Sequence, residues 1–123
     1  MQPGAFSLSL AVKDIEVSKT FYGHLGFSAV AGDASQGWLI LQAGTVTIGL
    51  FQGMLASNMM TFNPGWDSKG KALAVFEDIR LLQKKFQNAG IAIPKPIDPE
   101  GSGPASFSIA DPDGNAILFD QHV

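Results

Sequence analysis

The feature of this 123-residue sequence that most constrains its fold is an internal repeat. Segments 14–26 and 78–90 each begin with Asp, continue with apolar residues at helical spacing, and end with Gly. Asp is a favoured helix N-cap and Gly a favoured C-terminal stop, so each segment predicts one helix. The segments superpose at a constant offset of 64 residues, from Asp14 to Asp78. The chain is therefore predicted to contain two copies of one unit.

A strand is predicted before each helix. Apolar residues alternate with small or polar ones over residues 6–12, and a similar alternation covers residues 71–76. Period two is typical of a strand with one buried face. After the helices, strands are predicted at the following ranges: 38–42, 45–52, 91–93, 105–110 and 116–120. Each half thus predicts the order β-α-β-β-β or close to it.

The second half contains a strong turn signal, Asp-Pro-Asp-Gly-Asn at residues 111–115. Because Gly accepts positive φ cheaply, this motif predicts a hairpin turn. A calcium loop of the EF-hand type needs a longer series of ligands that ends in a bidentate Glu, which is missing here.

We predict a single domain over residues 1–123, with module one at about 5–53 and module two at about 71–123. The connecting segment 54–70 is irregular and apolar, with Phe62 and Trp66 around an Asn-Pro-Gly turn. An apolar segment of this kind predicts a loop or flap that is covered by the domain itself, a ligand or a second subunit.

Charge and composition exclude several classes of protein. The net charge is −3 and the basic residues are scattered apart from Lys84 and Lys85, so nucleic acid is not an expected partner. The chain has no cysteine, which excludes a disulfide framework and a Cys-ligated metal. No apolar run approaches the roughly 20 residues of a membrane span, and no export signal is recognised. We predict a cytoplasmic protein with no membrane partner.

Two motifs carry a resemblance to a known family. Val-x-Asp-Ile followed by Phe-Tyr-x-x-Leu-Gly-Phe occupies residues 12–27, and Asp-Pro-Asp-Gly-Asn precedes the last strand. With these motifs the sequence resembles the vicinal oxygen chelate superfamily, which includes glyoxalases, bleomycin resistance proteins and dioxygenases. The resemblance covers nearly the whole chain. It implies an α+β fold in which two βαβββ modules form a half-open mixed or antiparallel barrel, and it implies a homodimer.

The resemblance also implies where metal-using relatives carry His and carboxylate ligands. In this sequence those four places hold Ser7, Gly49, Lys71 and Leu118, and a shift of one residue replaces Gly49 by Ile48. Imidazole or carboxylate donors are required for a divalent cation, and a lysine ammonium would repel it. We therefore predict no metal and no cofactor.

The residues opposite the helix-packing side of each strand are expected to line a cleft, together with aromatic walls. The predicted ligand-binding residues are Ser7, Ser9, Trp38, Thr47, Phe51, Phe62, Trp66, Lys71, Leu118 and Asp120. Lys71 and Asp120 are the ionisable members of this set, and their opposite charges could shift each other's pKa. His24 is expected at a helix end and His122 in a solvated tail.

The favoured function is a metal-independent small-molecule-binding protein similar to the bleomycin resistance branch, with the ligand in an aromatic-walled cleft. One alternative is a metal-free isomerase, epimerase or lyase that uses Lys71 or Asp120 on a small carbonyl compound. Another is a metal-dependent glyoxalase- or dioxygenase-like enzyme, if the strand register is misread. A third is a purely structural homodimer. Whether the chain is an enzyme remains open.

Overall fold

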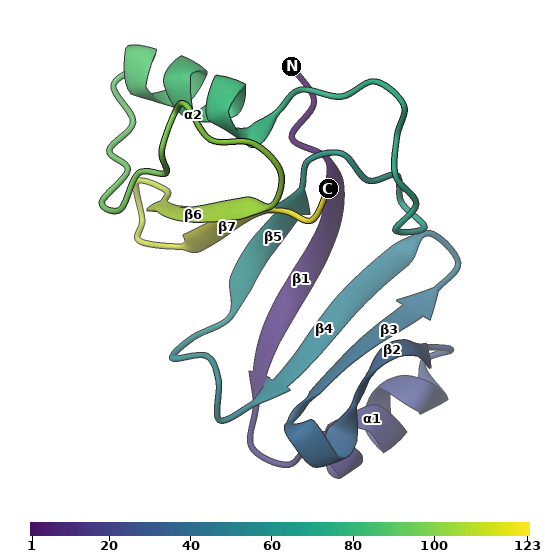
Figure 1. Cartoon of the computed structure of the whole chain (residues 1–123). Coiled ribbons are helices and arrows are strands. Elements are labelled where there is room, and N and C mark those ends of the chain that lie inside the picture. The colour runs from purple at the N-terminus through teal and green to yellow at the C-terminus, as the bar shows by residue number, and fades with distance from the viewer. The chain divides into compact units, whose positions relative to one another are not determined.

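The computed structural model describes residues 1–123 and shows a mixed α+β chain with seven strands and two α-helices (Figure 1). The elements in order are β1 (Ala5–Val12), α1 (Ile15–His24), β2 (Ser28–Asp33), the 3-10 helix η1 (Ala34–Gln36), β3 (Trp38–Ala43), β4 (Val46–Gln52), β5 (Met59–Asn63), α2 (Ile79–Asn88), β6 (Ala105–Ala110) and β7 (Ala116–Gln121). The predicted α+β class is confirmed.

The chain divides into two compact units. We call residues 7–59 the first unit, and residues 1–6 with 60–123 the second unit. These units are defined by their compactness, and the predicted modules at about 5–53 and 71–123 stay a prediction. Neither helix has the length and apolar character needed to cross a membrane.

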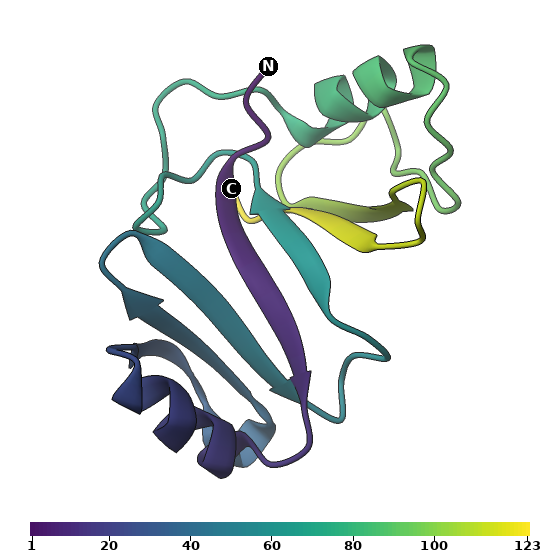
Figure 2. The same cartoon turned by 180° about the vertical axis from the view of Figure 1, so that it is seen from behind.

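The first unit has the β-α-β-β-β order predicted from the sequence, with its strands arranged β2-β3-β4-β1. β1 runs parallel to β4, and β3 is antiparallel to both of its neighbours. α1 lies along one face of these strands (Figure 2). On that face Leu39, Leu41, Ile48 and Leu50 are buried with Ile15 of the helix.

The packing of β1 settles which way its side chains face. Leu8, Leu10 and Val12 pack against the core under α1, so Ser7 and Ser9 belong to the opposite, helix-free face. The period-two prediction for this strand is confirmed.

The second unit contains α2 and the strands β5, β7 and β6 in that spatial order. β6 and β7 form an antiparallel hairpin with Phe107 opposite Phe119. Both rings pack against the helix residues Ile79, Leu82 and Phe86. These rings and aliphatic side chains form the core of the unit.

The hairpin turn at residues 111–115 is confirmed. Asp111 Oδ1 accepts hydrogen bonds from the backbone N–H groups of Asp113 at 2.9 Å and Asn115 at 2.8 Å. Gly114 has φ +85°, which a glycine adopts without strain. Hydrogen bonds from the Asn115 side chain and backbone lower the pKa of Asp111. The carboxylate of Asp111 therefore serves the turn itself.

The internal repeat is visible in the hydrogen bonds at both helix starts. Asp14 and Asp78 cap α1 and α2, accepting from backbone N–H groups of the first turn. The backbone N–H of Ile15 donates to Gln52 Oε1 at 2.8 Å, and that of Ile79 donates to Gln121 Oε1, also at 2.8 Å. Each unit thus uses a glutamine from its last strand to complete the helix start.

The helix ends repeat as well. In the first unit the backbone N–H of Phe27 donates to the carbonyl of Tyr22 at 3.1 Å. In the second unit Ile91 donates to Phe86 at 3.0 Å. Tyr22 and Phe86 are 64 residues apart, so the equivalence deduced from the sequence extends to the hydrogen bonds that close each helix.

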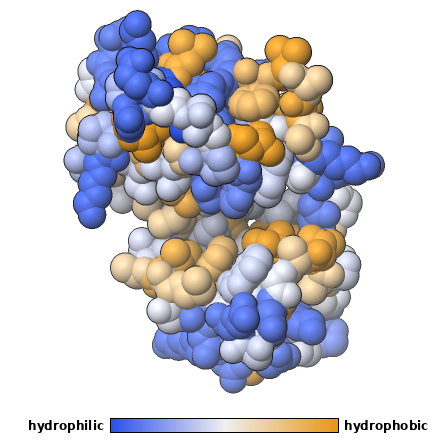
Figure 3. Space-filling view, viewed as in Figure 1, coloured by the Kyte–Doolittle hydropathy of each residue, from blue (hydrophilic) through white to orange (hydrophobic).

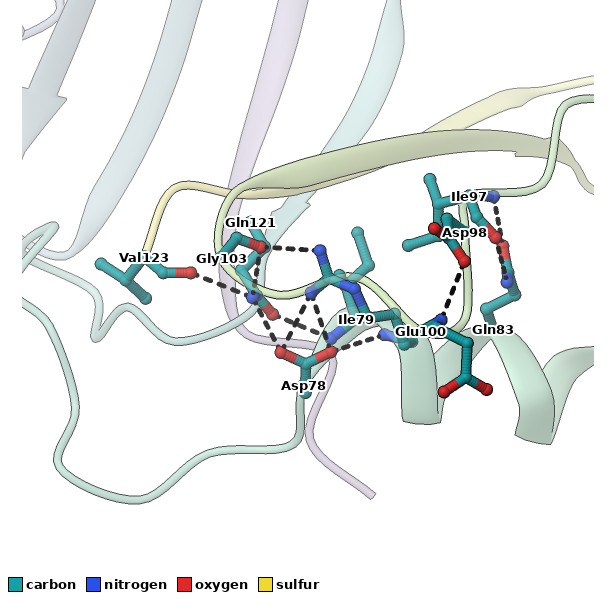
Figure 4. Close-up of polar contacts among 10 residues, drawn as sticks. Asp78, Ile79, Gln83, Ile97, Asp98, Glu100, Gly103, Gln121 and Val123 are labelled. Carbon is teal, nitrogen blue, oxygen red and sulfur yellow. Dashed lines mark hydrogen bonds and ion pairs between the residues drawn. The ribbon is translucent and has the colours of Figure 1, made fainter.

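Gln121 makes further contacts in the second unit (Figure 4). Its Nε2 lies 3.0 Å from Asp78 Oδ2, 3.2 Å from the Gly103 carbonyl and 3.0 Å from the Val123 carbonyl. Arg80 donates from Nη1 to Asp78 Oδ1 at 3.1 Å and from Nη2 to the Gly103 carbonyl at 3.0 Å. This network ties the start of α2 to the end of β7 and to the loop before β6.

Two strand predictions in the second unit are wrong. Residues 71–76 and 91–93 form no strand, whereas β5 lies inside the segment expected to be irregular. β5 occupies the place beside β7, so residues 71–76 find backbone partners elsewhere. Leu73 N–H donates to the Gly65 carbonyl at 2.7 Å, and the Lys71 carbonyl accepts from Asp67 N–H at 2.9 Å.

Candidate functional site

The helix-free face of the first unit carries five of the predicted site residues. Ser7 and Ser9 come from β1, Trp38 from β3, and Thr47 and Phe51 from β4. The register places Trp38 directly opposite Phe51. This half of the predicted set therefore lies on one sheet face.

Polar and aromatic groups alternate across that face. Gln42 is opposite Thr47 and donates from Nε2 to Thr47 Oγ1 at 3.1 Å. Gly49 lies between Ser9 and Ile40, and a Cβ at this position would come within 2.5 Å of the Phe51 ring. The ring of Phe51 therefore covers the backbone of Gly49, and hydrogen-bonding groups lie beside two aromatic side chains.

The second unit brings together two predicted site residues through a third that the sequence analysis missed. The ring of Trp66 stacks on His122, with centroids 4.5 Å apart and planes 14° apart. His122 Nε2 in turn lies 3.0 Å from Asp120 Oδ2. His122 is exposed and follows β7, as expected of a tail residue, but its contacts with Trp66 and Asp120 were not predicted. Its position two residues beyond Asp120 was the signal that could have placed both side chains on one side.

The remaining three residues of the predicted set lie apart from this cluster. Phe62 packs in the core, where its ring is 5.4 Å from that of Phe119. Leu118 is opposite Ser108 and, by strand alternation, faces away from Phe119. Lys71 is exposed in the loop before α2, and Asp120 pairs with His122 rather than with Lys71.

A cavity of about 580 Å³ lies in the second unit beside Trp66. We call it the Trp66 groove. Its walls come from residues 2–6, 65–68 and 73–77, and its aromatic members are Phe6, Trp66 and Phe76. Figure 3 shows hydrophobic side chains exposed over the loop between β5 and α2, where Leu73 and Val75 also line the groove.

Contacts of Gly65 hold in place the loop that forms part of the groove wall. Gly65 has φ +92°, and a Cβ there would lie 2.5 Å from Val123 and 3.2 Å from Phe76. The backbone of Gly65 also accepts from Leu73 N–H. Only glycine fits this position, so the close approach of the C-terminal residue to the loop depends on it.

Both charged side chains on the groove walls are carboxylates. The backbone N–H groups of Lys71 and then Lys69 donate to Asp67 and lower its pKa. A hydrogen bond from Lys85 at 2.7 Å lowers the pKa of Glu77. Carboxylates with ordinary or lowered pKa values are ionised at neutral pH, so the groove combines aromatic walls with negative charge.

The structure contains no group of three His, Cys, Asp or Glu side chains placed to hold a metal ion. On the helix-free face of the first unit, the places implied for ligands hold Ser7 and Gly49. In the second unit they hold Lys71 and Leu118. These residue types do not fit a divalent cation, and we derive no metal-dependent step.

Comparisons with known proteins agree on the type of fold. A family model described as the Glyoxalase/Bleomycin resistance protein/Dioxygenase superfamily matches residues 5–119. A crystal structure of a member of that superfamily from Vibrio splendidus 12B01 is similar, with TM-score 0.64, 18% identity, and coverage of 94% of this chain and 97% of that chain.

A second similar crystal structure is named an NAD-dependent benzaldehyde dehydrogenase from Legionella pneumophila. The TM-score is 0.69 at 14% identity, and the match covers 96% of this chain and 99% of that chain. At these identities the likeness shows the fold alone, and the activity in that name belongs to the Legionella protein. No functionally curated protein matches this chain.

Proposed function

The chain belongs to the glyoxalase/bleomycin resistance protein/dioxygenase superfamily, and we propose that this member binds a small, partly apolar molecule without a metal ion. The observation that carries the proposal is the Trp66 groove. Its volume of about 580 Å³ lies within the usual range of small-molecule sites, roughly 300 to 1,000 Å³. Mostly apolar walls with a few polar groups are also typical of such sites.

The free energy of burying apolar surface limits how tightly a small ligand can bind in the groove. One aromatic ring that buries on the order of 150 Å² of apolar surface gains about 4 kcal/mol, which corresponds to a dissociation constant in the millimolar range. Loss of translational and rotational freedom lowers the net gain. We therefore expect single-ring probes to bind weakly, and a natural ligand to be larger and to contact several of the aromatic walls.

The helix-free face of the first unit is a second surface in the same proposal. Trp38 and Phe51 supply apolar contact there, and Thr47 supplies a hydroxyl group. A variant with Trp38→Phe retains Trp66 as its tryptophan, and one with Trp66→Phe retains Trp38, because the sequence has two tryptophans. A fluorescence change in the Trp38→Phe variant therefore reports binding near Trp66, and a change in the Trp66→Phe variant reports binding near Trp38.

The test uses benzyl alcohol as a neutral aromatic probe and protein treated with EDTA. Binding is followed by Trp66 fluorescence in the Trp38→Phe variant and by NMR chemical shifts. We expect saturable millimolar binding that Phe76→Ser weakens about fivefold or more, because Phe76 lines the groove. Leu81→Ser is the control, since Leu81 is an exposed apolar residue of the same unit that does not line the groove.

Two outcomes would contradict the proposal. One is the absence of saturable binding in the untreated and EDTA-treated protein alike. The other is stoichiometric metal in the purified protein, together with thermal stabilisation by Ni²⁺, Mn²⁺, Zn²⁺ or Fe²⁺, because a specific ligand of the native state must raise its stability.

The Asp120–His122 pair favours a second candidate function, a metal-free enzyme acting on a small carbonyl compound. A carboxylate that accepts from an imidazole orients it, and an oriented imidazole is a common general base. Such an isomerase, epimerase or lyase would exchange the α-proton of a substrate with solvent. A panel of α-protonated aldehydes and ketones in D₂O, followed by NMR with His122→Gln as control, tests this candidate; no exchange above the variant's rate rejects it.

We also propose that the protein is a homodimer. Helix α1 exposes Val17 and Phe21, and its C-cap residue Leu25 continues the same spacing of four residues, which makes one apolar stripe. Contiguous exposed apolar surface supports an interface with another protein chain. Light scattering tests the oligomeric state, and a mass equal to one chain of 13.0 kDa would reject the dimer.

A further inference from the structure

Resting on the proposed function of the Trp66 groove, we infer that the groove selects an organic cation, an ammonium or amidinium group carried on an aromatic or apolar body. The charged side chains that line the groove are Asp67 and Glu77, and no Lys, Arg or His lines it. Three aromatic rings face the same space. Charge and apolar character thus point to one class of ligand.

Asp67 is the group best placed to bind the cationic head. It follows Trp66 directly in the chain, and both residues line the groove. The hydrogen bonds from the backbone of Lys69 and Lys71 both end on Oδ1, at 2.8 and 3.0 Å. These bonds hold the carboxylate in place on the groove wall, and they lower the pKa of Asp67.

Glu77 adds to the negative charge but is partly neutralised. Its Oε2 lies 2.7 Å from Lys85 Nζ, and its Oε1 lies 4.0 Å from the Met1 ammonium. The pairs show that this end of the groove already attracts cations of the chain itself. An anionic ligand would approach two ionised carboxylates without a basic partner on the walls, and like charges repel at this range.

The aromatic walls favour the same ligand class. A cation near the face of Trp, Tyr or Phe is attracted by the ring quadrupole, most strongly by Trp. Trp66, Phe6 and Phe76 therefore attract both the apolar body and the charged head, whereas a neutral aromatic molecule gains only from burial. Charge selectivity should appear as a difference between probes that share one ring.

The test compares benzyltrimethylammonium, benzyl alcohol and benzoate at pH 7 and low ionic strength, with Trp66 fluorescence of the Trp38→Phe variant as the readout. We expect the cation to bind about tenfold more tightly than benzoate and about threefold more tightly than benzyl alcohol. Raising NaCl to about 0.5 M should reduce the advantage of the cation, because salt screens exposed charges.

Three variants locate the effect. Asp67→Asn should reduce the affinity for the cation to that for benzyl alcohol, and Glu77→Gln should reduce it less. The Asp67→Asn variant retains the Oδ1 atom that accepts from Lys69 and Lys71, and the readout is the ratio of the affinities for the cation and for benzyl alcohol within each variant. Glu100→Gln is the matched control, since Glu100 is an exposed carboxylate of the same unit that does not line the groove.

The outcomes separate the two proposals. If benzyl alcohol binds and benzoate binds as tightly as the cation, the charge selectivity is overturned and the binding function stands. If the advantage of the cation survives in the Asp67→Asn, Glu77→Gln double variant, the carboxylates are not its cause and the inference is overturned. If no probe of any charge binds, both the inference and the binding function fail.

Discussion

Helices α1 and α2 begin and end with equivalent hydrogen bonds, yet they are buried to very different extents. α2 buries Ile79, Leu82 and Phe86, and its core is completed by the rings of Phe107 and Phe119. α1 buries Ile15 alone. The exposed fractions of Val17, Phe21 and Leu25 are 65%, 59% and 59%, so the apolar residues of α1 are divided between two sides.

The two helices share their caps but differ in burial because these two properties depend on different parts of the sequence. Caps and helix stops depend on a few local residues, and these recur at the same offset in both units. Burial depends on what packs against the helix, and this differs between the units. In α2 the outer position equivalent to Phe21 is Lys85, which pairs with Glu77. Helix α2 is amphipathic in the usual way, whereas α1 is apolar on more than one side.

The largest expected effect comes from the removal of a buried ring from α2. Phe86→Ala should lower the free energy of unfolding by about 3 to 4 kcal/mol, because it leaves a cavity among Phe107, Phe119 and Leu82. In the monomeric chain, Phe21→Ala on the exposed side of α1 should change it by less than about 0.5 kcal/mol. Urea denaturation followed by circular dichroism measures both. Equal costs would mean that α1 is packed as firmly as α2.

The sequence predicted β1, β3 and β4 of the first unit well because their apolar alternation is regular, whereas β2 had no predicted range and is exposed along its whole length. The pairs Leu8 with Ile48 and Leu10 with Leu50 put the expected side chains against α1. Residues 71–76 failed because alternation reports a preference for extended backbone and does not report which segment occupies the place beside β7. That competition with β5 is decided by tertiary contacts.

The candidate site was predictable in part for a similar reason. Strand alternation put Ser9, Thr47 and Phe51 on the face away from the helix, as the structure has them. The segment 54–70 has no such periodicity in its sequence, so neither the place of Phe62 in β5 nor the Trp66 groove was predicted from it. The stacking of His122 on Trp66 was missed because an exposed residue after the last strand was not expected to make specific contacts.

A smaller effect should distinguish the two glutamines that complete the helix starts. Gln121 is 1% exposed and its side chain contacts four backbone or side-chain partners, whereas Gln52 is exposed. Gln121→Ala should cost about 2 to 3 kcal/mol, because it leaves buried polar groups without partners. Gln52→Ala should cost about 1 kcal/mol, because water replaces the lost bond to Ile15. A reversed order in thermal or urea unfolding would contradict the comparison.

The smallest effect concerns the two capping carboxylates. Asp14→Ala and Asp78→Ala should each cost about 1 kcal/mol as lost N-caps, with Asp78 toward 2 kcal/mol because it also holds Arg80 and Gln121. Asp78→Asn keeps a capping side chain and removes only the charge. Comparing it with the unmodified protein therefore isolates the ionised form of Asp78.

The pH dependence of that comparison has a definite sign. Burial by itself would raise the pKa of Asp78, but hydrogen bonds from the Arg80 backbone, Gln121 and the Arg80 side chain outweigh it and lower the pKa below its ordinary value of 3.8. The ionised form is thus favoured by folding, so its contribution is present above pH 3.8 and is lost as the pH falls through the lowered value. Urea unfolding from pH 7 down to about pH 2.5 should show the advantage over Asp78→Asn shrinking with acid. An advantage that grew with acid would mean that burial, not the Arg80 and Gln121 hydrogen bonds, controls this carboxylate.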